Sequence, residues 1–356
     1  MKISLIMMAS ATLFLSSLAG AREIRVPEMV ASIQAAVDEA KPGDVVSVNS
    51  GIWNEAVDLK GKAITLRARE GDGKVILDGT ELEDSVLRCL DGEGPETIID
   101  GFMIMNGSGH RDLYGDKSAV GGGLLILGAS PVIRNCQFIN NDVNYNGGAI
   151  YMARGSRPQF ENCIFDRNEA EKGGAIYSVQ SQPMINGCTF RNNEGRYSGG
   201  AIYNADGTDA KINESRFESN RASYYGGAVY QYGSLASLKS CIFDRNRATY
   251  KGGAVCNGYK GFSTLVDCAQ LTNHDDVSGG KAPHVTAVAP KGACVLGDGS
   301  CLIVSRQSCE DAAGSYRSDG SDCHGDGGTK MAHGNDLNRD GRIDDRDALM
   351  LLLLWR

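Results

Sequence analysis

The chain has 356 residues, 42% hydrophobic and 22% charged, with a formal net charge of −8 at pH 7. This length allows one large domain with small appendages. The acidic balance argues against a nucleic-acid partner, because proteins of that class present a basic face. The 46 glycines and only 8 prolines predict many tight turns and argue against a disordered low-complexity chain.

Residues 1–21 have the pattern of a secretory signal peptide. Lys2 supplies the positive start, an apolar run extends through Leu18, and Ala19-Gly20-Ala21 forms a small-residue cleavage site. The alternative is a membrane anchor, but the run is short and is interrupted by serine and threonine. No later stretch reaches the roughly 18 consecutive apolar residues of a membrane span. We therefore expect a secreted bacterial protein, extracellular or associated with the cell surface, with no transmembrane span after cleavage.

A phrase repeats through the middle of the chain at intervals of 25 to 27 residues. Residues 165–178 read FDRNEAEKGGAIYS, and residues 243–255 read FDRNRATYKGGAV. Paired glycines begin at Gly122, Gly147, Gly173, Gly199, Gly226 and Gly252. The phrase Phe-x-x-Asn keeps step with them, at Phe138/Asn141, Phe165/Asn168, Phe190/Asn193, Phe217/Asn220 and Phe243/Asn246. A fixed period of this length indicates an array of structural repeats.

Each repeat reads as one coil of three short strands. In the second repeat the strands are GGAIY, PQF and CIF, whereas helical repeats need long amphipathic stretches. Asn135 and Asn162 directly precede the third strand of their repeats, and asparagine tolerates a left-handed bend. Successive coils would stack with parallel strands, so that each side chain lies about 4.8 Å from its counterpart. We expect about nine such coils between residues 45 and 275.

The chain resembles the right-handed parallel β-helix proteins of the pectin-lyase-like superfamily. Its GGAI and Phe-x-x-Asn phrases are similar to the repeats of polymorphic outer-membrane proteins, and SIQAAVDEAKPGDVVSVNSGIWNEAVDL is similar to the start of other secreted β-helix proteins. The resemblance implies an all-β, right-handed, single-stranded parallel β-helix over residues 22–275, with an N-terminal capping helix around Ser32–Ala40. Ile33, Ala36 and Val37 would form the apolar face of that helix. The fold hosts lyases, hydrolases, isomerases and adhesins, so the resemblance does not specify a function.

Three ladders of repeated residues are expected to build the interior and the bends. One column contains Cys136, Cys163, Cys188, Cys241 and Cys268, with Ser215 as its fourth rung. A metal or redox ladder is the alternative, but no histidine or carboxylate repeats beside the column, and buried cysteine behaves as a small hydrophobe. The repeated phenylalanines lie two positions further along the strand and point the same way, into the core. The repeated asparagines end that strand and would hydrogen-bond along the rod.

A fourth ladder suggests a binding surface. It contains Tyr151, Tyr177, Tyr203 and Tyr230. Each tyrosine follows an isoleucine or valine that reads as buried, so strand alternation places the tyrosines on the outer face. An outward aromatic track would suit the apolar faces and hydroxyls of sugar rings, and we expect a polysaccharide or cell-surface glycan as partner. The alternative is that the tyrosines shield the sheet or pack under the neighbouring loops.

Residues 106–122, NGSGHRDLYGDKSAVGG, form the one long insertion in the repeat region. Long loops in a compact scaffold are often functional, so His110, Arg111, Asp112 and Lys117 are the candidate catalytic residues if the chain is an enzyme. An exposed polar loop is the alternative. Resemblance to lyases and hydrolases of this fold implies carboxylates on adjacent coils, where they bind a cation or transfer protons. No such column of carboxylates is found in the repeats.

The repeat stops near residue 275, and residues 276–292 read as a linker. A small cysteine-rich segment follows at 293–324, with Cys294, Cys301, Cys309 and Cys323. Four cysteines in a short exported segment predict two disulfides, and three pairings remain open. A zinc site is the alternative to disulfides, but the spacings of these cysteines do not match pairs of the C-x2-C type.

Residues 325–356 contain the strongest single motif. The stretch DLNRDGRIDDRD, residues 336–347, fits a calcium-binding loop of the EF-hand type. Its expected Ca²⁺ ligands are Asp336, Asn338, Asp340, Arg342 through its carbonyl, Asp344 and Asp347. Residues 348–355 would form the helix that follows. This resembles one half of a type I dockerin, which implies a cohesin-like protein partner. Dockerins carry two such loops and only one is found here.

Two main functions remain open from the sequence. The first is a non-catalytic extracellular protein that binds a glycan or another surface through the rod face, with a calcium-binding docking tail. The second is a polysaccharide lyase or glycoside hydrolase, which the superfamily and the dockerin-like tail imply. A surface adhesin or scaffold is a third reading. The lack of a carboxylate column places the binding protein ahead of the enzyme.

Overall fold

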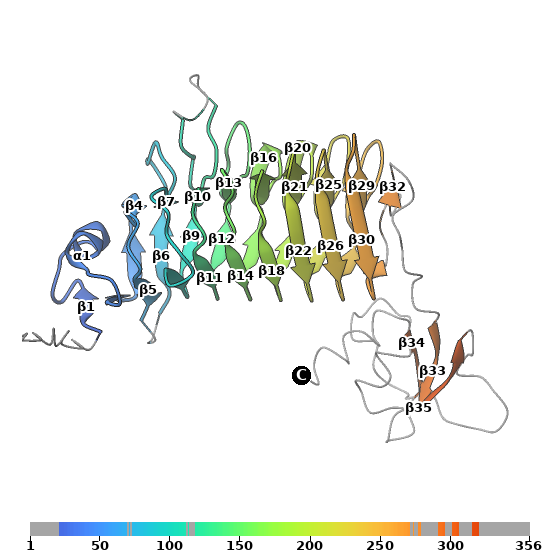
Figure 1. The fold of residues 1–356 in the computed structure, drawn as a ribbon, viewed down its shortest axis with the longest axis horizontal. Helices are drawn as coiled ribbons and strands as arrows, with labels where there is room; N and C mark the ends of the chain where they lie inside the picture. Colours follow the sequence, from blue (N-terminus) through green and yellow to red (C-terminus); the bar gives the residue numbers. More distant parts are fainter. Residues whose placement is uncertain are drawn as a thin grey trace, which may run out of the picture.

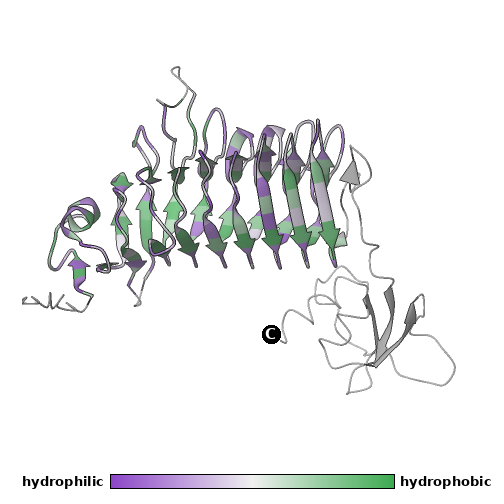
Figure 2. Ribbon diagram, in the orientation of Figure 1, coloured by the Kyte–Doolittle hydropathy of each residue, from purple (hydrophilic) through white to green (hydrophobic). Residues whose placement is uncertain are grey.

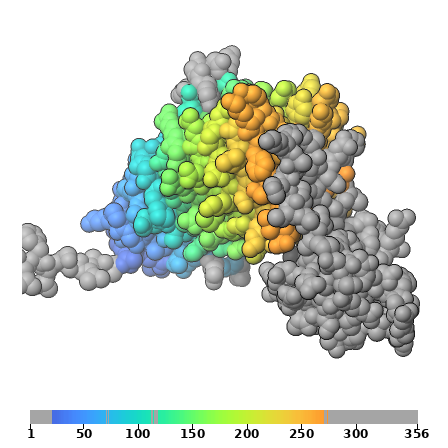
Figure 3. Space-filling view, turned by 45° about the vertical axis from the view of Figure 1, so that its right-hand side comes forward, coloured from blue at the N-terminus to red at the C-terminus, as the bar shows by residue number. Residues whose placement is uncertain are grey.

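A rod of stacked coils dominates the computed structural model (Figure 1). The coils follow the sequence along the rod, from the blue N-terminal coils to the orange ones (Figures 1 and 3). The structure describes residues 21–69, 71, 73–111, 113, 118–269 and 273 in full, and the backbone alone of 270, 277–278, 291–295, 301–305 and 315–319. Within these residues, no helix has the length and apolar character needed to span a membrane.

Three parallel sheets form the sides of the rod, and each coil contributes one strand to each sheet. Sheet A contains β1 (Glu23–Val26), β2 (Val45–Val48), β5 (Thr65–Ala68), β8 (Ile98–Asp100), β11 (Val132–Arg134), β14 (Gln159–Glu161), β18 (Met184–Asn186), β22 (Asp209–Asn213), β26 (Leu235–Lys239) and β30 (Phe262–Val266). Sheet B contains β3 (Gly51–Trp53), β6 (Val75–Asp78), β9 (Met103–Met105), β12 (Gln137–Ile139), β15 (Ile164–Asp166), β19 (Thr189–Arg191), β23 (Arg216–Glu218), β27 (Ile242–Asp244) and β31 (Ala269–Gln270). Sheet C contains β4 (Val57–Asp58), β7 (Leu87–Cys89), β10 (Leu124–Leu127), β13 (Ile150–Ala153), β17 (Ile176–Val179), β21 (Ile202–Ala205), β25 (Val229–Gln231), β29 (Val255–Asn257) and β32 (Val277–Ser278).

This architecture confirms the predicted all-β parallel β-helix of about nine coils, since sheets B and C contain nine strands each. Two further sheets were not predicted. Sheet D joins the loops between sheets B and C and contains β16 (Glu169–Lys172), β20 (Glu194–Ser198), β24 (Arg221–Ala222) and β28 (Arg247–Ala248). Sheet E is antiparallel and contains β33 (Lys291–Val295), β34 (Cys301–Ser305) and β35 (Ser315–Asp319), so it begins two residues before the predicted cysteine-rich segment.

One helix, α1 (Ile33–Glu39), lies at the N-terminal end of the rod, where the sequence predicts it (Figure 1). The Ser32 side chain caps the helix by accepting a hydrogen bond from the backbone N–H of Ala35 at 3.2 Å. The predicted apolar face is buried, because Ile33, Ala36 and Val37 are all 0% exposed. α1 thus places an apolar surface on the first coil of the rod.

The core is a stack of identical side chains, as the ladders predict. The rings of Phe165 and Phe190 lie 4.6 Å apart, with planes within 3° of parallel, and the stack continues to Phe138, Phe217 and Phe243. The cysteine column is buried beside it, and the seven described cysteines are free thiols. Burial raises the pKa of the Cys136 thiol, which fits a packing role. Figure 2 shows the resulting pattern of hydrophobic and hydrophilic residues along the strands.

The predicted bends are also present. Asn135, Asn162 and Gly187 each lie directly before a cysteine of the buried column, and their φ angles are 54°, 53° and 61°. These values lie in the left-handed region that asparagine and glycine tolerate. At the far end of the same strand, each ladder asparagine is buried and donates its side-chain amide to the asparagine of the next coil. The bends therefore hold every coil to the same outline.

Candidate functional site

The predicted tyrosine ladder exists, but most of it is not exposed. Tyr151, Tyr177, Tyr203 and Tyr230 pair in register on the outer face of sheet C, with neighbouring rings 5.0 to 5.4 Å apart. Tyr151, Tyr203 and Tyr230 are only 2%, 6% and 8% exposed, and Tyr177 is half-buried. The prediction of an open aromatic track at these residues is therefore wrong, although they do point away from the core.

Loops between sheets B and C cover this ladder. Tyr145 packs against the cluster around Tyr151, and Tyr225 packs against the cluster that contains Tyr203 and Tyr230. Both covering tyrosines come from the loops that precede the paired glycines. Burial raises the pKa of Tyr203, with further contributions from the neighbouring tyrosines Tyr177 and Tyr230. The ladder is thus a second, outer hydrophobic layer rather than a binding face.

The exposed tyrosines lie on those loops. Tyr197, Tyr224 and Tyr250 occupy equivalent positions in three successive coils and are 41%, 48% and 59% exposed. The half-buried Tyr145 occupies the same position two coils earlier. We call these four residues the loop row. Sheet D holds the loops in register, because Ser198, Tyr225 and Lys251 form parallel backbone bridges directly after the row.

Cationic side chains lie against the loop row. In the coil that has no tyrosine, Glu171 holds the equivalent position and Lys172 follows it. Lys172 Nζ is 5.8 Å from the centre of the Tyr145 ring and 5.9 Å from that of Tyr197, and it pairs with Glu171 at 3.9 Å. Lys251 Nζ is 5.7 Å from the centre of the Tyr250 ring. These are cation–π distances. Glu171 offsets the charge of Lys172, so Lys251 is the lysine that adds positive charge to the row. Rings with hydroxyls and nearby cations can bind hydroxyl-rich and anionic groups.

Two arginines extend this positive charge. Arg221 and Arg247 are directly opposite each other on β24 and β28, and both are exposed. Like charges in register repel each other unless an anion lies between them. Nearer the N-terminus the positive charge is neutralised, because the Arg196 side chain bonds to Glu169, at 2.7 Å, and to Asp142. Burial lowers the pKa of Arg196, but these two contacts together outweigh it and raise the pKa. Glu194 on β20 is directly opposite Arg221 on its other side, so the positive charge of the loop edge is concentrated at Arg247 and Lys251, beside Tyr250.

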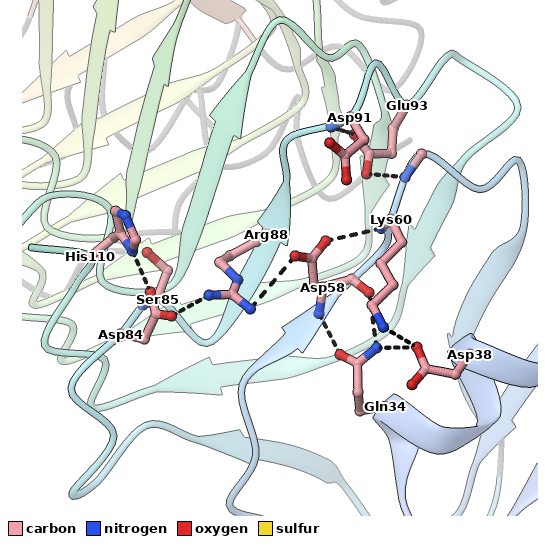
Figure 4. Close-up of polar contacts among 11 residues, drawn as sticks. Gln34, Asp38, Asp58, Lys60, Asp84, Ser85, Arg88, Asp91, Glu93 and His110 are labelled. Atoms are coloured by element: carbon pink, nitrogen blue, oxygen red, sulfur yellow. Dashed lines mark hydrogen bonds and ion pairs between the residues drawn. The ribbon is translucent and has the colours of Figure 1, made fainter. Parts of the chain in front are cut away.

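A separate polar network surrounds His110 (Figure 4). Its Nδ1 is 2.8 Å from Oδ1 of Asp84, and the other oxygen of Asp84 pairs with Arg88. Arg88 also lies 3.6 Å from Asp58, and its buried Nε has no hydrogen-bond partner among the described residues. The side chains of His110, Asp84 and Arg88 are 23 to 25% exposed, so solvent reaches the network. Lys60 and Gln34 continue the polar contacts toward α1.

The backbone fixes this network firmly. His110 pairs with Val120 by two hydrogen bonds, of 2.9 and 3.0 Å, which close the base of the predicted long insertion. Arg88 and Asp58 are neighbours on β7 and β4. They occupy the same outward column of sheet C as the tyrosine ladder, with Leu125 in between. Only this register relates them to the ladder. The repeat phrase is absent from their coils, so the sequence does not reveal the register there.

The other predicted site residues have mixed outcomes. Arg111 is exposed next to His110. Asp112 and Lys117 lie outside the described residues, as does the whole predicted calcium loop. Cys294 and Cys301 are on β33 and β34, which the structure describes by their backbone alone, so the predicted disulfides stay predictions. Among the described residues, no group of three or more histidine, cysteine or acidic side chains could hold a metal ion.

Comparison with known proteins supports the fold. The family model for the right-handed β-helix region matches residues 101–270. No curated protein sequence matches the chain. The pectin methylesterase of Aspergillus niger is 11% identical with a TM-score of 0.47, over 75% of this chain and 92% of that one. An alginate lyase from a Paenibacillus species is 11% identical with a TM-score of 0.45, over 72% and 98%. The Streptococcus pneumoniae surface adhesin PfbA is 13% identical with a TM-score of 0.32, over 77% and 94%. The rod is a right-handed β-helix, and its function has to be argued from its surface.

Proposed function

We propose that this protein is a secreted binding protein whose β-helix holds an extracellular polysaccharide through the loop row. The single observation that carries the proposal is the exposure of Tyr197, Tyr224 and Tyr250 in three successive coils, beside Lys251. Tyrosine offers an apolar ring and a hydroxyl to a ligand that is wet on one side and apolar on the other. Backbone hydrogen bonds of 2.9 and 3.0 Å already join Tyr197, Tyr224 and Tyr250 from coil to coil, so binding costs little ordering of the loops.

The local charge favours an acidic polysaccharide. Arg221, Arg247 and Lys251 are exposed within two coils of the loop row. The chain as a whole is acidic, with a formal net charge of −8. A basic strip on an acidic protein attracts a polyanion to that strip and repels it elsewhere, which orients the encounter. Because exposed charges are screened by salt, binding is expected to weaken as ionic strength rises.

Affinity electrophoresis tests the proposal. The mature chain is run through gels that contain polygalacturonate, alginate, xylan or no polymer. We expect an acidic polymer to retard the wild type. The variant that combines Tyr224→Ser and Tyr250→Ser is expected to lose this retardation. Ile52→Ser is the matched control, because Ile52 is 65% exposed on β3, in another sheet. Lack of retardation in every polymer, or equal retardation of the tyrosine variant, would overturn the proposal.

A second function is favoured by the His110 network, namely proton transfer to or from a bound polysaccharide. Asp84 accepts a hydrogen bond from Nδ1 of His110 in this reading, which leaves Nε2 as the base. Asp84→Asn would remove the charge that orients the ring, while Arg157→Gln, at an exposed residue outside the network, is the control. Unsaturated products or new reducing ends that depend on Asp84 would support this reading. Release of neither product from any polymer would rule it out and leave the binding protein.

The C-terminal tail completes the proposal. The loop from Asp336 to Asp347 would hold Ca²⁺ through the oxygen ligands that its spacing provides. The Ca²⁺-bound loop would present a surface to a cohesin-like protein or another component at the cell surface. The rod would then bind the glycan while the tail anchors the protein. Pull-down of the partner with and without Ca²⁺ tests this division of roles.

A further inference from the structure

Two further exposed tyrosines lie at the end of the sheet C strands opposite the loop row. Tyr232 follows β25 and Tyr259 follows β29, and they are 37% and 62% exposed with ring centres 5.9 Å apart. Lys260 Nζ is 5.1 Å from the centre of the Tyr259 ring. We call Tyr232 and Tyr259 the bend pair, because the chain turns there from sheet C into sheet A. The bend pair has the same composition as the loop row: exposed tyrosine with a lysine beside it.

Tyrosines connect the two exposed sets across the sheet. The Tyr225 ring is 5.4 Å from that of Tyr250 in the loop row and 5.7 Å from that of Tyr230 in the ladder. The Tyr230 hydroxyl in turn lies in the space that a side chain at Gly258 would fill. Gly258 is the residue before Tyr259, so the hydroxyl reaches the coil of the bend pair. Tyr230 itself is only 8% exposed, so it supports the surface between the two exposed sets from below.

We propose that the loop row and the bend pair form one binding surface that crosses the rod, so that a single glycan chain lies over sheet C from one set to the other. The inference rests on the proposed function and adds the bend pair as a second contact region for the same ligand. The arrangement sets the direction of the glycan. A chain that followed the loop row alone would run along the rod axis and never reach Tyr259.

The charges at the two ends define the ligand further. Lys251 and Lys260 each lie against an exposed ring, one at either end of the tyrosine path. A glycan that spans the path would place acidic groups at both ends and an apolar sugar face between them, over the half-buried Tyr225. A short oligosaccharide would reach only one lysine. Affinity is therefore expected to rise with chain length until both ends are occupied, as for two linked binding modules.

A length series of oligogalacturonates tests the inference by calorimetry on the full mature chain. The variant that combines Tyr232→Ser and Tyr259→Ser is expected to bind long oligomers about tenfold more weakly, while binding the disaccharide as the wild type does. Leu235→Ser is the matched control, because Leu235 is 51% exposed nearby but faces outward from sheet A. Circular dichroism of each variant confirms the fold.

The outcomes separate this inference from the proposed function. Full affinity of the bend-pair variant at every length, together with loss of affinity in Tyr224→Ser with Tyr250→Ser, would overturn the crossing path and leave the loop row in place. Loss of disaccharide binding in the bend-pair variant would also overturn it, because the short ligand would then not sit on the loop row. Full affinity of both variants would overturn the inference and the proposed function together.

Discussion

Asn193 accepts two hydrogen bonds from Asn168 of the preceding coil through its single side-chain oxygen. The backbone N–H and the side-chain Nδ2 of Asn168 both lie 3.0 Å from Oδ1 of Asn193. Asn193 itself donates Nδ2 to Oδ1 of Asn220 and to the carbonyl of Phe165, each at 2.9 Å. One fully buried side chain thus links three coils, which makes the asparagine ladder the polar counterpart of the phenylalanine stack.

Replacing this residue is expected to cost more than its size suggests. Asn193→Gly leaves buried groups of the two adjacent coils without partners, at about 1–3 kcal/mol each, so the free energy of unfolding falls by about 3–5 kcal/mol. Urea denaturation measures the loss. Asn192→Gly is the control, because Asn192 is exposed at φ 56° and loses only a hydrogen bond to Asp166. Equal losses in the two variants would show that the ladder does not hold the coils.

The paired glycines make a second, purely steric prediction. A Cβ at Gly174 would lie 2.5 Å from the carbonyl oxygen of Glu194 and would also meet that of Gly200. Neighbouring coils hold both carbonyls in place, so Gly174→Ala is expected to lower the free energy of unfolding by at least about 3 kcal/mol. At Gly155, φ is +77° but no atom lies within 4 Å, so Gly155→Ala should cost about 1 kcal/mol. Thermal unfolding of both variants decides, and a similar melting temperature for the two would contradict the steric account.

The tyrosine ladder predicts loss of stability at high pH. Burial raises the pKa of Tyr230 to about 12, whereas an exposed phenol ionises near about pH 10. Between these values the unfolded chain loses the proton and the folded chain keeps it. The contribution of the neutral Tyr230 hydroxyl to the free energy of unfolding is therefore complete below about pH 10. This contribution is lost as the pH rises to about 12, at up to about 1.4 kcal/mol per pH unit.

The free energy of unfolding of Tyr230→Phe is expected to fall less steeply over this pH range. Tyr250→Phe is the control, because Tyr250 is 59% exposed and its removal should leave the slope unchanged. Denaturation of the three proteins across the range measures the slopes. Identical slopes for the wild type and Tyr230→Phe would contradict the burial of this hydroxyl in the folded protein.

The calcium loop predicts a metal-dependent tail. Asp340→Ala and Asp347→Ala each remove an expected ligand, so calorimetric titration of the full chain should show binding at least about tenfold weaker, because the charge and number of ligands set the affinity. Asp345→Ala is the matched control, since this residue is at loop position 10, where the motif supplies no ligand. Removal of Ca²⁺ with a chelator should leave the polysaccharide affinity of the rod unchanged. A titration that shows no Ca²⁺ binding would remove the tail from the proposal.

The fold was predictable because the repeat places the same residue in the same environment in every coil. Phe165 and Asn168 could be assigned to the core and the bend from spacing alone, and their partners one coil away confirm it. The outer face was harder to predict. Strand alternation correctly pointed Tyr203 away from the core, but alternation contains no information about a loop that folds back over the sheet.

The same limit explains the rest of the candidate site. Tyr224 and Tyr250 lie just after β24 and β28 of sheet D, and these two-residue strands are too short to leave a sequence pattern. Asp84 and Arg88 precede the regular repeats, so no period relates them to His110. Their contact arises because the insertion returns to the sheet at Val120, a tertiary event that local sequence does not encode.

The central claim is tested most directly by comparing the polysaccharide affinity of a loop-row variant with that of a covered-ladder variant. Polygalacturonate binding is measured by calorimetry for Tyr224→Ser with Tyr250→Ser and for Tyr203→Phe, which removes one covered hydroxyl and keeps its ring. The account predicts loss of at least about tenfold in affinity for the first variant and wild-type affinity for the second. Wild-type affinity in the loop-row variant with weakened binding in Tyr203→Phe would contradict the account and return the site to the ladder.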